Sequence, residues 1–291
     1  MTAHETGETA TTEPASRARR MLEGLAFVAG WIAIGYVFDL GKTLNHQCVY
    51  LLIGIPITIM FQLVIRKRPL RELWVRNGPR LSFRSVLAPV TVLLMIVPVY
   101  LLVRDIADTN GAGFVGYDLV LFVGAIGAGY AARQFTDATW ADLAKCFLTA
   151  GLIGILSAID VYANTTTAHP FGSPFDAPAT RDFFVSLGTY LVAVFVLEEV
   201  WFRGALDSHV HHQGERHGIL SAIFVSLLWS WWHLPLTVGT PVIEAIFQLP
   251  IVMVPMGIFL SIFWRRSGNL AVPGFSHAFS DSVRNILIGV P

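Results

Sequence analysis

The chain has 291 residues, of which 54% are hydrophobic and only 14% are charged, and its formal net charge is zero. Its mean hydropathy of +0.60 lies far above that of soluble domains, so the composition argues against a soluble protein and predicts one of the lipid bilayer. The charge balance provides no broad basic field for nucleic acid, and membrane lipids are the expected partners. Cys48 and Cys146 lack CxxC spacing and predict neither a disulfide nor a structural zinc site.

Residues 1–20 are rich in Thr, Ala and Glu without apolar periodicity, and are predicted to form a disordered cytoplasmic tail. A membrane-spanning helix needs about 20 mostly apolar residues. The rest of the chain offers about eight or nine such segments, which predicts an all-α, polytopic bundle. The expected spans are Leu22–Leu40, Val49–Ile65, Val86–Val103, Phe114–Ala132, Leu143–Tyr162, Phe183–Leu206, Ile219–Leu236, Val242–Trp264 and Leu270–Val290.

Basic loops predict the orientation, because Lys and Arg near helix ends are retained in the cytoplasm. The loop between the second and third spans carries seven of them: Arg66, Lys67, Arg68, Arg71, Arg76, Arg80 and Arg84. This loop is therefore predicted to be cytoplasmic, together with the amino terminus, in a multi-pass integral membrane protein (of the cell membrane, if bacterial). Residues 164–182 then form an extracytoplasmic loop between the amino-terminal helices, 21–163, and a carboxy-terminal helix bundle, 183–291.

The sixth span, FFVSLGTYLVAVFVLEEVWFRGAL, contains Glu198, Glu199 and Arg203. Each charge in a membrane helix costs at least about 2.5 to 3.5 kcal/mol and needs a partner, a wet cavity or a function. Glu199 and Arg203 are four residues apart and are predicted to pair on one helix face. Glu198 is rotated by about 100° from Glu199 and is free to act as a general base. The alternative is a salt bridge that anchors the helix end at the interface.

The seventh span places His233 deep in an aromatic run, one turn after Trp229. Imidazole suits proton transfer or metal ligation. The alternative is a neutral histidine that is bonded to a backbone carbonyl or belongs to an interfacial aromatic belt. The predicted depths of the three candidate side chains in the membrane disagree. At 1.5 Å per residue, His233 lies roughly 21 Å from its inner helix end, and Glu198 and His277 lie roughly 12 and 10 Å from theirs. An extended, tilted seventh helix would reconcile them.

The last span places His277 and Asp281 one turn apart on one helix face, where the carboxylate could orient the imidazole. The alternative is an amphipathic helix lying in the membrane interface. A serine hydrolase is disfavoured because the chain has no GxSxG motif, although three serines lie nearby: Ser276, Ser280 and Ser282. Two further acids in apolar spans, Asp118 and Glu244, are expected to face the bundle interior.

These elements together resemble the CAAX prenyl protease and bacteriocin-processing family, also called the Abi family. Its signature is EExxxR, then FxxxH, then HxxxN on successive membrane helices. The matching segments are Glu198–Arg203, Trp229–His233 and His277–Asp281, and the resemblance covers about residue 183 onward. The chain departs from the motifs with Trp229 in place of Phe and Asp281 in place of Asn.

The resemblance implies an intramembrane endopeptidase acting on a membrane-associated or prenylated peptide. Glu198 would activate a water with help from His233, and that water would attack a peptide carbonyl. His277 and Asp281 would stabilise the oxyanion or orient the site, supported by Glu199 and Arg203. Because an ionised carboxylate cannot donate a hydrogen bond as an amide does, Asp281 must be protonated or must orient His277.

No obligatory cofactor is expected, although one carboxylate and two histidines could hold zinc. HExxH is absent, and the loop histidines are expected to bind metal only adventitiously: His209, His211, His212 and His217. One alternative function is an ion-coupled transporter with the same residues as a proton relay, although no internal repeat of the motifs is present. The other is a catalytically silent scaffold or immunity protein.

Overall fold

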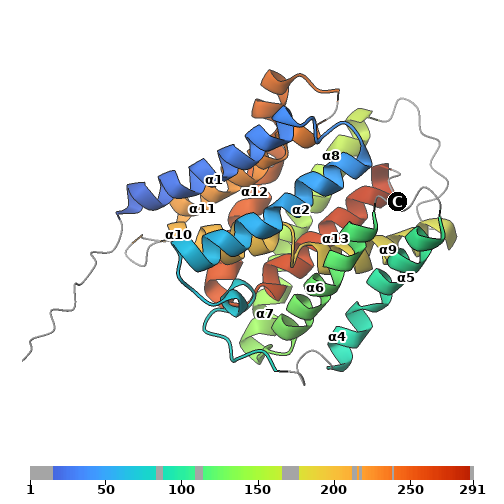
Figure 1. The fold of residues 1–291 in the computed structure, drawn as a ribbon, viewed down its shortest axis with the longest axis horizontal. Helices are drawn as coiled ribbons and strands as arrows, with labels where there is room; N and C mark the ends of the chain where they lie inside the picture. Colours follow the sequence, from blue (N-terminus) through green and yellow to red (C-terminus); the bar gives the residue numbers. More distant parts are fainter. Residues whose placement is uncertain are drawn as a thin grey trace, which may run out of the picture.

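The computed structural model of the protein describes residues 16–82, 88–108, 114–165, 177–211, 215, 218–237 and 239–288. In this part of the chain the regular structure is helical, apart from one isolated bridge between Val75 and Asn269. The predicted all-α, polytopic bundle is confirmed (Figure 1). Residues 1–15 of the predicted tail lie outside the described residues, whereas residues 17–20, which were predicted to belong to the disordered tail, are helical. Helix α1 (Arg17–Val37) starts just after them and is capped by the Ser16 hydroxyl, which accepts from the backbone N–H of Arg19 at 3.3 Å.

Seven helical segments of the described chain are long and apolar enough to cross a membrane. They are α1; α2 (Leu44–Met60) with η1 (Phe61–Ile65); α4 (Pro89–Leu94) with α5 (Ile96–Ala107); α6 (Val115–Ala132); α7 (Asp137–Cys146) with η4 (Phe147–Gly151) and α8 (Leu152–Thr165); α11 (Ile219–Trp232) with η6 (Leu234–Leu236); and α12 (Val242–Ser267). The other helical elements are η2 (Leu70–Leu73), α9 (Ala177–Ala193), η5 (Val200–Asp207), α10 (Ser208–Val210) and α13 (Ala271–Ile288). The seven overlap the first five, the seventh and the eighth predicted spans, so this is a multi-pass membrane protein, whereas a total of eight or nine spans is not confirmed.

The prediction that the sixth span is one helix over Phe183–Leu206 is wrong. α9 ends at Ala193, a turn covers residues 194–198, and the π-helix η5 begins at Val200. The backbone hydrogen bonds first span fewer residues than in an α-helix, with Phe195 N–H donating to the carbonyl of Val192. They then span more, with Val200 N–H donating to the carbonyl of Val194. Such π-turns are frequent at functional sites, and this one places the two adjacent glutamates where the helix changes pitch.

The ninth predicted span corresponds to α13, which lies in the middle of the bundle (Figure 1) and packs against α7, α8, α9 and α12. Ser276, Ser280 and Ser282 are buried, and each hydroxyl donates to the backbone carbonyl four residues earlier. This burial rules out the alternative of an amphipathic helix at the membrane interface. It also leaves these three hydroxyls bonded to the helix backbone, which agrees with the argument against a serine hydrolase drawn from the absence of a GxSxG motif.

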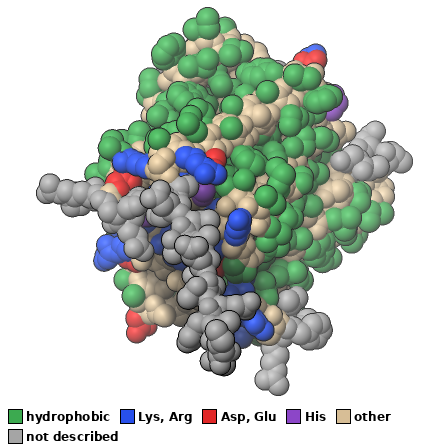
Figure 2. All heavy atoms as spheres, turned by 60° about the vertical axis from the view of Figure 1, so that its left-hand side comes forward, with side chains coloured by type: hydrophobic (Ala, Val, Ile, Leu, Met, Phe, Trp, Pro, Cys, Tyr) green, Lys and Arg blue, Asp and Glu red, His purple; other side chains and the backbone are tan. Residues whose placement is uncertain are grey.

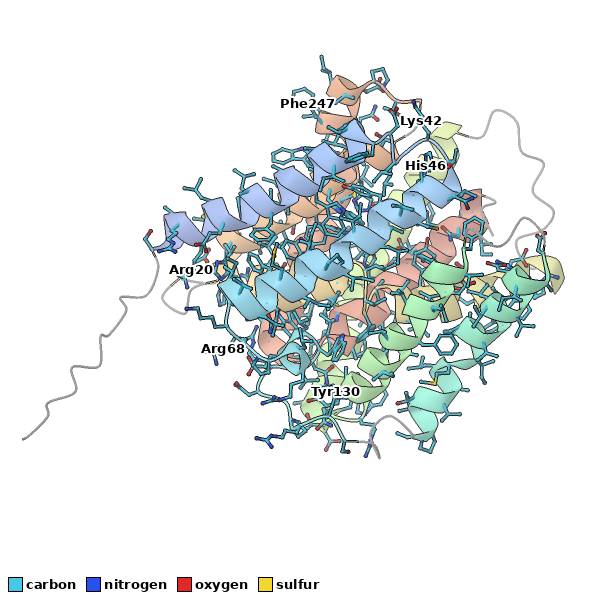
Figure 3. The ribbon with its side chains drawn as sticks, viewed as in Figure 1. Arg20, Lys42, His46, Arg68, Tyr130 and Phe247 are labelled. Atoms are coloured by element: carbon cyan, nitrogen blue, oxygen red, sulfur yellow. The ribbon has the colours of Figure 1, made fainter. Side chains whose placement is uncertain are left out.

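Basic residues mark one end of the bundle. Arg20 and Arg68 lie at this end, and Lys42 and His46 lie at the other (Figure 3). Viewed with the Arg20 end turned forward, the surface is mostly apolar, and Lys and Arg side chains gather mainly on the left and lower part of this face (Figure 2). The start of α1 and the basic loop after η1 therefore share one side of the bundle, as the predicted orientation requires. That this side is cytoplasmic stays a prediction.

The two isolated acids differ in their surroundings. Asp118 on α6 is 2% exposed, as expected of a side chain that faces the bundle interior. Glu244 on α12 is exposed and accepts from the side-chain amide of Gln248 at 2.6 Å, so the prediction that it faces the interior is wrong. Its partner lies one helical turn away, which satisfies the carboxylate without burying it.

A cluster of buried aromatic side chains from α1, α2 and α11 fixes the end of α11. The indole N–H of Trp31 donates to the carbonyl of Tyr50 at 2.9 Å, and the Tyr50 hydroxyl donates to the carbonyl of Trp232 at 2.8 Å. The Tyr50 ring also stacks on Trp232, with 5.5 Å between centroids. Because His233 follows Trp232 directly, these contacts set the position of that imidazole.

The close approach of α6 and α9 depends on Gly124. A Cβ atom at this position would overlap the carbonyl oxygen of Val192, whereas one at Gly116 on the same helix would meet nothing within 4 Å. Gly124→Ala is expected to destabilise the protein by about 1 to 3 kcal/mol, because the two backbones must move apart. Thermal unfolding in detergent micelles measures the effect with Gly116→Ala as the control. Equal unfolding temperatures for the two variants would contradict the expectation.

Candidate active site

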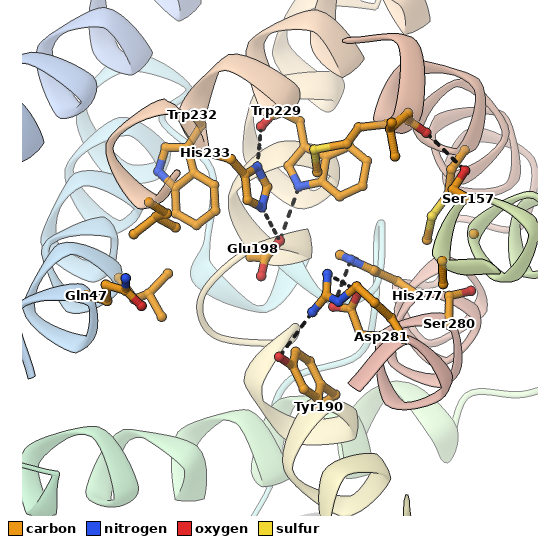
Figure 4. Close-up of a pocket in the computed structure, with 18 residues that line it drawn as sticks. Gln47, Ser157, Tyr190, Glu198, Trp229, Trp232, His233, His277, Ser280 and Asp281 are labelled. Carbon is orange, nitrogen blue, oxygen red and sulfur yellow. Dashed lines mark hydrogen bonds and ion pairs between the residues drawn. The ribbon is translucent and has the colours of Figure 1, made fainter. Parts of the chain in front are cut away.

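A cavity of about 310 Å³ lies between α2, α8, α9, α11, α12 and α13. All four residues predicted to be catalytic line it: Glu198, His233, His277 and Asp281. Its apolar wall is formed by Leu51, Leu236, Val252, Met253 and Met256. Figure 4 shows Glu198 with His233 and Trp229 on one side and His277 and Asp281 on the other. The structure thus brings together three sets of residues that are far apart in the sequence.

Glu198 is the acid of the cavity. It is the last residue of the turn that follows α9, and its side chain is 16% exposed. Its Oε2 accepts a hydrogen bond from the indole N–H of Trp229 at 3.2 Å and lies 3.9 Å from Nε2 of His233. The single N–H donor stabilises a carboxylate, and the remaining lone pairs stay available to the cavity.

His233 caps the carboxy-terminal end of α11, where Pro235 follows in the short helix η6. Its Nδ1 lies 2.9 Å from the carbonyl oxygen of Trp229. Because a carbonyl only accepts, Nδ1 carries the hydrogen of this bond. In the neutral ring Nε2 is then the acceptor, and it is this nitrogen that faces Glu198. The bond to a backbone carbonyl proposed as the alternative reading is present, but it leaves the second nitrogen exposed to the cavity.

The predicted ion pair between Glu199 and Arg203 is present, at 2.8 Å with both side chains fully buried. The guanidinium also lies over the ring of Trp229, 4.6 Å from the centroid, where a cation–π interaction stabilises it. The same Oε1 of Glu199 lies 3.0 Å from Nδ1 of His277. The ion pair is therefore also bonded to α13 through His277. Sequence spacing alone did not predict this contact.

His277 lies between two carboxylates. Its Nδ1 is 3.0 Å from Glu199 and its Nε2 is 3.3 Å from Asp281. Since ionised carboxylates only accept, both contacts are hydrogen bonds when each ring nitrogen carries a proton. Asp281 is therefore placed to orient the imidazole, one of the two roles expected of it from the sequence.

Two residues of the cavity were missed by the sequence analysis. Arg284 forms an ion pair with Asp281 at 3.0 Å, and its Nη2 lies 3.4 Å from the hydroxyl of Tyr190 on α9. Arg284 follows Asp281 by three residues on α13, which puts the two on one helix face. This i, i+3 spacing was the available signal for Arg284, whereas nothing in the sequence pairs it with Tyr190.

The side chains present do not fit a zinc ion. Among the described residues, no group of three or more His, Cys, Asp or Glu side chains is placed to hold a metal ion. Both nitrogens of His277 face carboxylates, at 3.0 and 3.3 Å, so this imidazole is not placed to join Glu198 and His233 as the third ligand that a catalytic zinc site requires. In the histidine-rich loop, His209 lies 2.8 Å from Glu23, while His212 and His217 lie outside the described residues.

The conflict in depth between the three motifs does not appear in the structure. Glu198 follows the end of α9, His233 lies at the end of α11, and His277 lies in the first half of α13, yet all three line one cavity.

Comparison with known proteins gives one finding about family. Residues 180–283, just over a third of the chain, match the family model described as Type II CAAX prenyl endopeptidase Rce1-like. The match spans the three motifs and confirms the resemblance drawn from them. No curated protein and no solved structure matches the chain.

Proposed function

We propose that this membrane protein, whose carboxy-terminal helices match a CAAX endopeptidase family, hydrolyses a peptide bond of a membrane-associated or prenylated peptide. The family is one of proteases, which supports a peptidase at this coarse level. The observation that carries the finer proposal is the placement of Glu198 Oε2 and His233 Nε2, 3.9 Å apart and facing one cavity. A water about 2.8 Å from each atom would bridge the two.

In the proposed reaction Glu198 takes a proton from this water while the water oxygen forms a bond to the peptide carbonyl carbon. The carbonyl oxygen becomes negatively charged in the tetrahedral intermediate and needs donors on the opposite wall. When the intermediate collapses, the C–N bond breaks and the amine leaves with the proton that Glu198 returns. His233 accepts from the attacking water through Nε2, and Glu199 with Arg203 holds the helices in place. The balance is one water consumed per bond, without a cofactor.

The test is peptide cleavage by the purified protein in detergent micelles. One labelled peptide carries a prenylated cysteine near its carboxy terminus, a second is identical but not prenylated, and a third has a leader-peptide sequence; mass spectrometry identifies the products. Wild-type protein is expected to cleave at least one of them, and His233→Gln to lower kcat by at least about 100-fold. His46→Gln, at the opposite end of the bundle from Arg20 (Figure 3), is the control and should cleave as wild type does.

Equal rates for wild type and His233→Gln would sink the proposal for these substrates and favour a transporter or a scaffold. Addition of a chelator is expected to leave cleavage unchanged, because the proposed water is activated by protein side chains alone. Loss of activity with the chelator, and recovery on addition of zinc, would contradict that mechanism.

Trp229→Phe tests the hydrogen bond to Glu198. The substitution keeps a ring at this position but removes the N–H that Glu198 Oε2 accepts at 3.2 Å. We expect kcat to fall about tenfold, which corresponds to the loss of one hydrogen bond to a charged group. Trp231→Phe is the matched control, since it removes an indole N–H that donates to the carbonyl of Ile246 instead. A kcat for Trp229→Phe equal to that of the control would mean that this bond does not support the base.

A further inference from the structure

Arg284 is a cationic side chain of the cavity that lies outside both the motifs and the family match, which ends at residue 283. Its Nη1 lies 3.0 Å from Oδ1 of Asp281, and its side chain is 40% exposed. It lines the same cavity as Glu198 and His277. Nη2 lies 3.4 Å from the Tyr190 hydroxyl and 3.3 Å from the side-chain oxygen of Asn285. A guanidinium has five N–H donors, so these contacts leave donors free for a group inside the cavity.

Asp281 poses a chemical problem for hydrolysis at this site. The family motif has Asn at this position, and an amide N–H can donate to the oxygen that becomes negatively charged. A carboxylate has no such hydrogen and repels a developing negative charge. Its second effect is on His277, because Nε2 of that ring is directed at Asp281 at 3.3 Å and is thereby partly withdrawn from the cavity.

We propose that Arg284 supplies the missing donor: given the proposed peptidase function, its guanidinium neutralises Asp281 and donates an N–H to the carbonyl oxygen of the scissile bond. Asp281 is then a positioning residue, which holds His277 on one side and Arg284 on the other. Tyr190 on α9 holds the far edge of the guanidinium. The pair of Asp281 and Arg284 thus replaces one neutral amide with a charged donor and its counter-charge.

Three variants test this assignment by cleavage kinetics and by thermal unfolding: Arg284→Gln, Asp281→Asn and the double variant. Arg284→Gln is expected to lower kcat about 100-fold with KM changed less than about threefold, as for loss of an oxyanion donor. The double variant restores the amide of the family motif and removes the unpaired carboxylate. Its kcat is expected to recover at least about tenfold relative to Arg284→Gln, and Asp281→Asn alone completes the double-mutant cycle.

Arg181→Gln is the matched control, since Arg181 pairs with Asp182 on the exposed start of α9 at 2.8 Å. An unchanged kcat in Arg284→Gln, with wild type active, overturns the role of Arg284 alone. If kcat falls in Arg284→Gln and recovers in the double variant in step with the unfolding temperature, the ion pair only stabilises the fold, and the assignment is overturned. A double variant whose kcat does not recover also overturns it. Absence of cleavage by the wild-type protein counts against the proposed peptidase function itself, and the role of Arg284 as a donor then has no reaction to act in.

Discussion

Glu198→Gln is expected to lower kcat for peptide cleavage by about 10³-fold, the largest effect on activity of any single substitution in the cavity. The amide has the size of the carboxylate and can still accept from Trp229, but it cannot take a proton from water. Because the native side chain makes one hydrogen bond, at 3.2 Å, and is partly exposed to the cavity, the unfolding temperature should change little. Steady-state kinetics on the labelled peptide measure the effect.

Glu244→Gln provides the control for this substitution. Glu244 is also a glutamate in an apolar helix, but it is exposed and bonded to Gln248 away from the cavity. It should keep wild-type kcat. A Glu198→Gln enzyme that retains more than about a tenth of the activity would show that another group activates the water.

Arg203→Gln is expected to cause the largest loss of stability, about 3 to 5 kcal/mol in the free energy of unfolding. Removing one partner of a buried pair leaves the other charge uncompensated, and here Glu199 and Arg203 are both fully buried. The guanidinium also loses its position over Trp229. Denaturant or thermal unfolding in detergent micelles measures the change.

The pair of Arg19 and Glu23 is a close control because it has the same i, i+4 spacing and a similar distance of 2.9 Å, with Arg19 71% exposed. Arg19→Gln should change stability little, since exposed pairs contribute little. The double variant Glu199→Gln with Arg203→Gln should recover part of the loss, because no buried charge is left unpaired. A similar unfolding temperature for Arg203→Gln and Arg19→Gln would contradict the buried-pair argument.

Hydropathy located the membrane helices well because the average over a whole span decides whether a helix can enter lipid. It could not detect the break after Ala193, because Val194, Phe195 and Val196 are as apolar as a continuous helix requires. The break is a change in hydrogen-bond pattern, which depends on what neighbouring helices offer to two adjacent glutamates.

The sequence predicted which motif residues would come together, but it did not predict most of the contacts between them. The spacing of Glu199 and Arg203 along one helix was enough to predict their ion pair. The contact of Glu199 with His277, at 3.0 Å, links residues 78 positions apart, and no local pattern signals such a contact. Arg284 was overlooked although it lies on the same helix face as Asp281, because its role depends on a cavity that becomes visible only when α9 and α13 are packed together.

The hydrogen bond from Tyr50 to the carbonyl of Trp232 has a consequence for how this protein can be divided. The family match begins at residue 180, yet the turn that carries His233 is held by a side chain of α2, and Gln47 and Leu51 of the same helix line the cavity. A fragment limited to the matched residues would contain every motif but lack the parts of the cavity wall that come from α2 and α8. The smallest part of the chain that can be transplanted with the cavity intact is therefore larger than the segment that matches the family model.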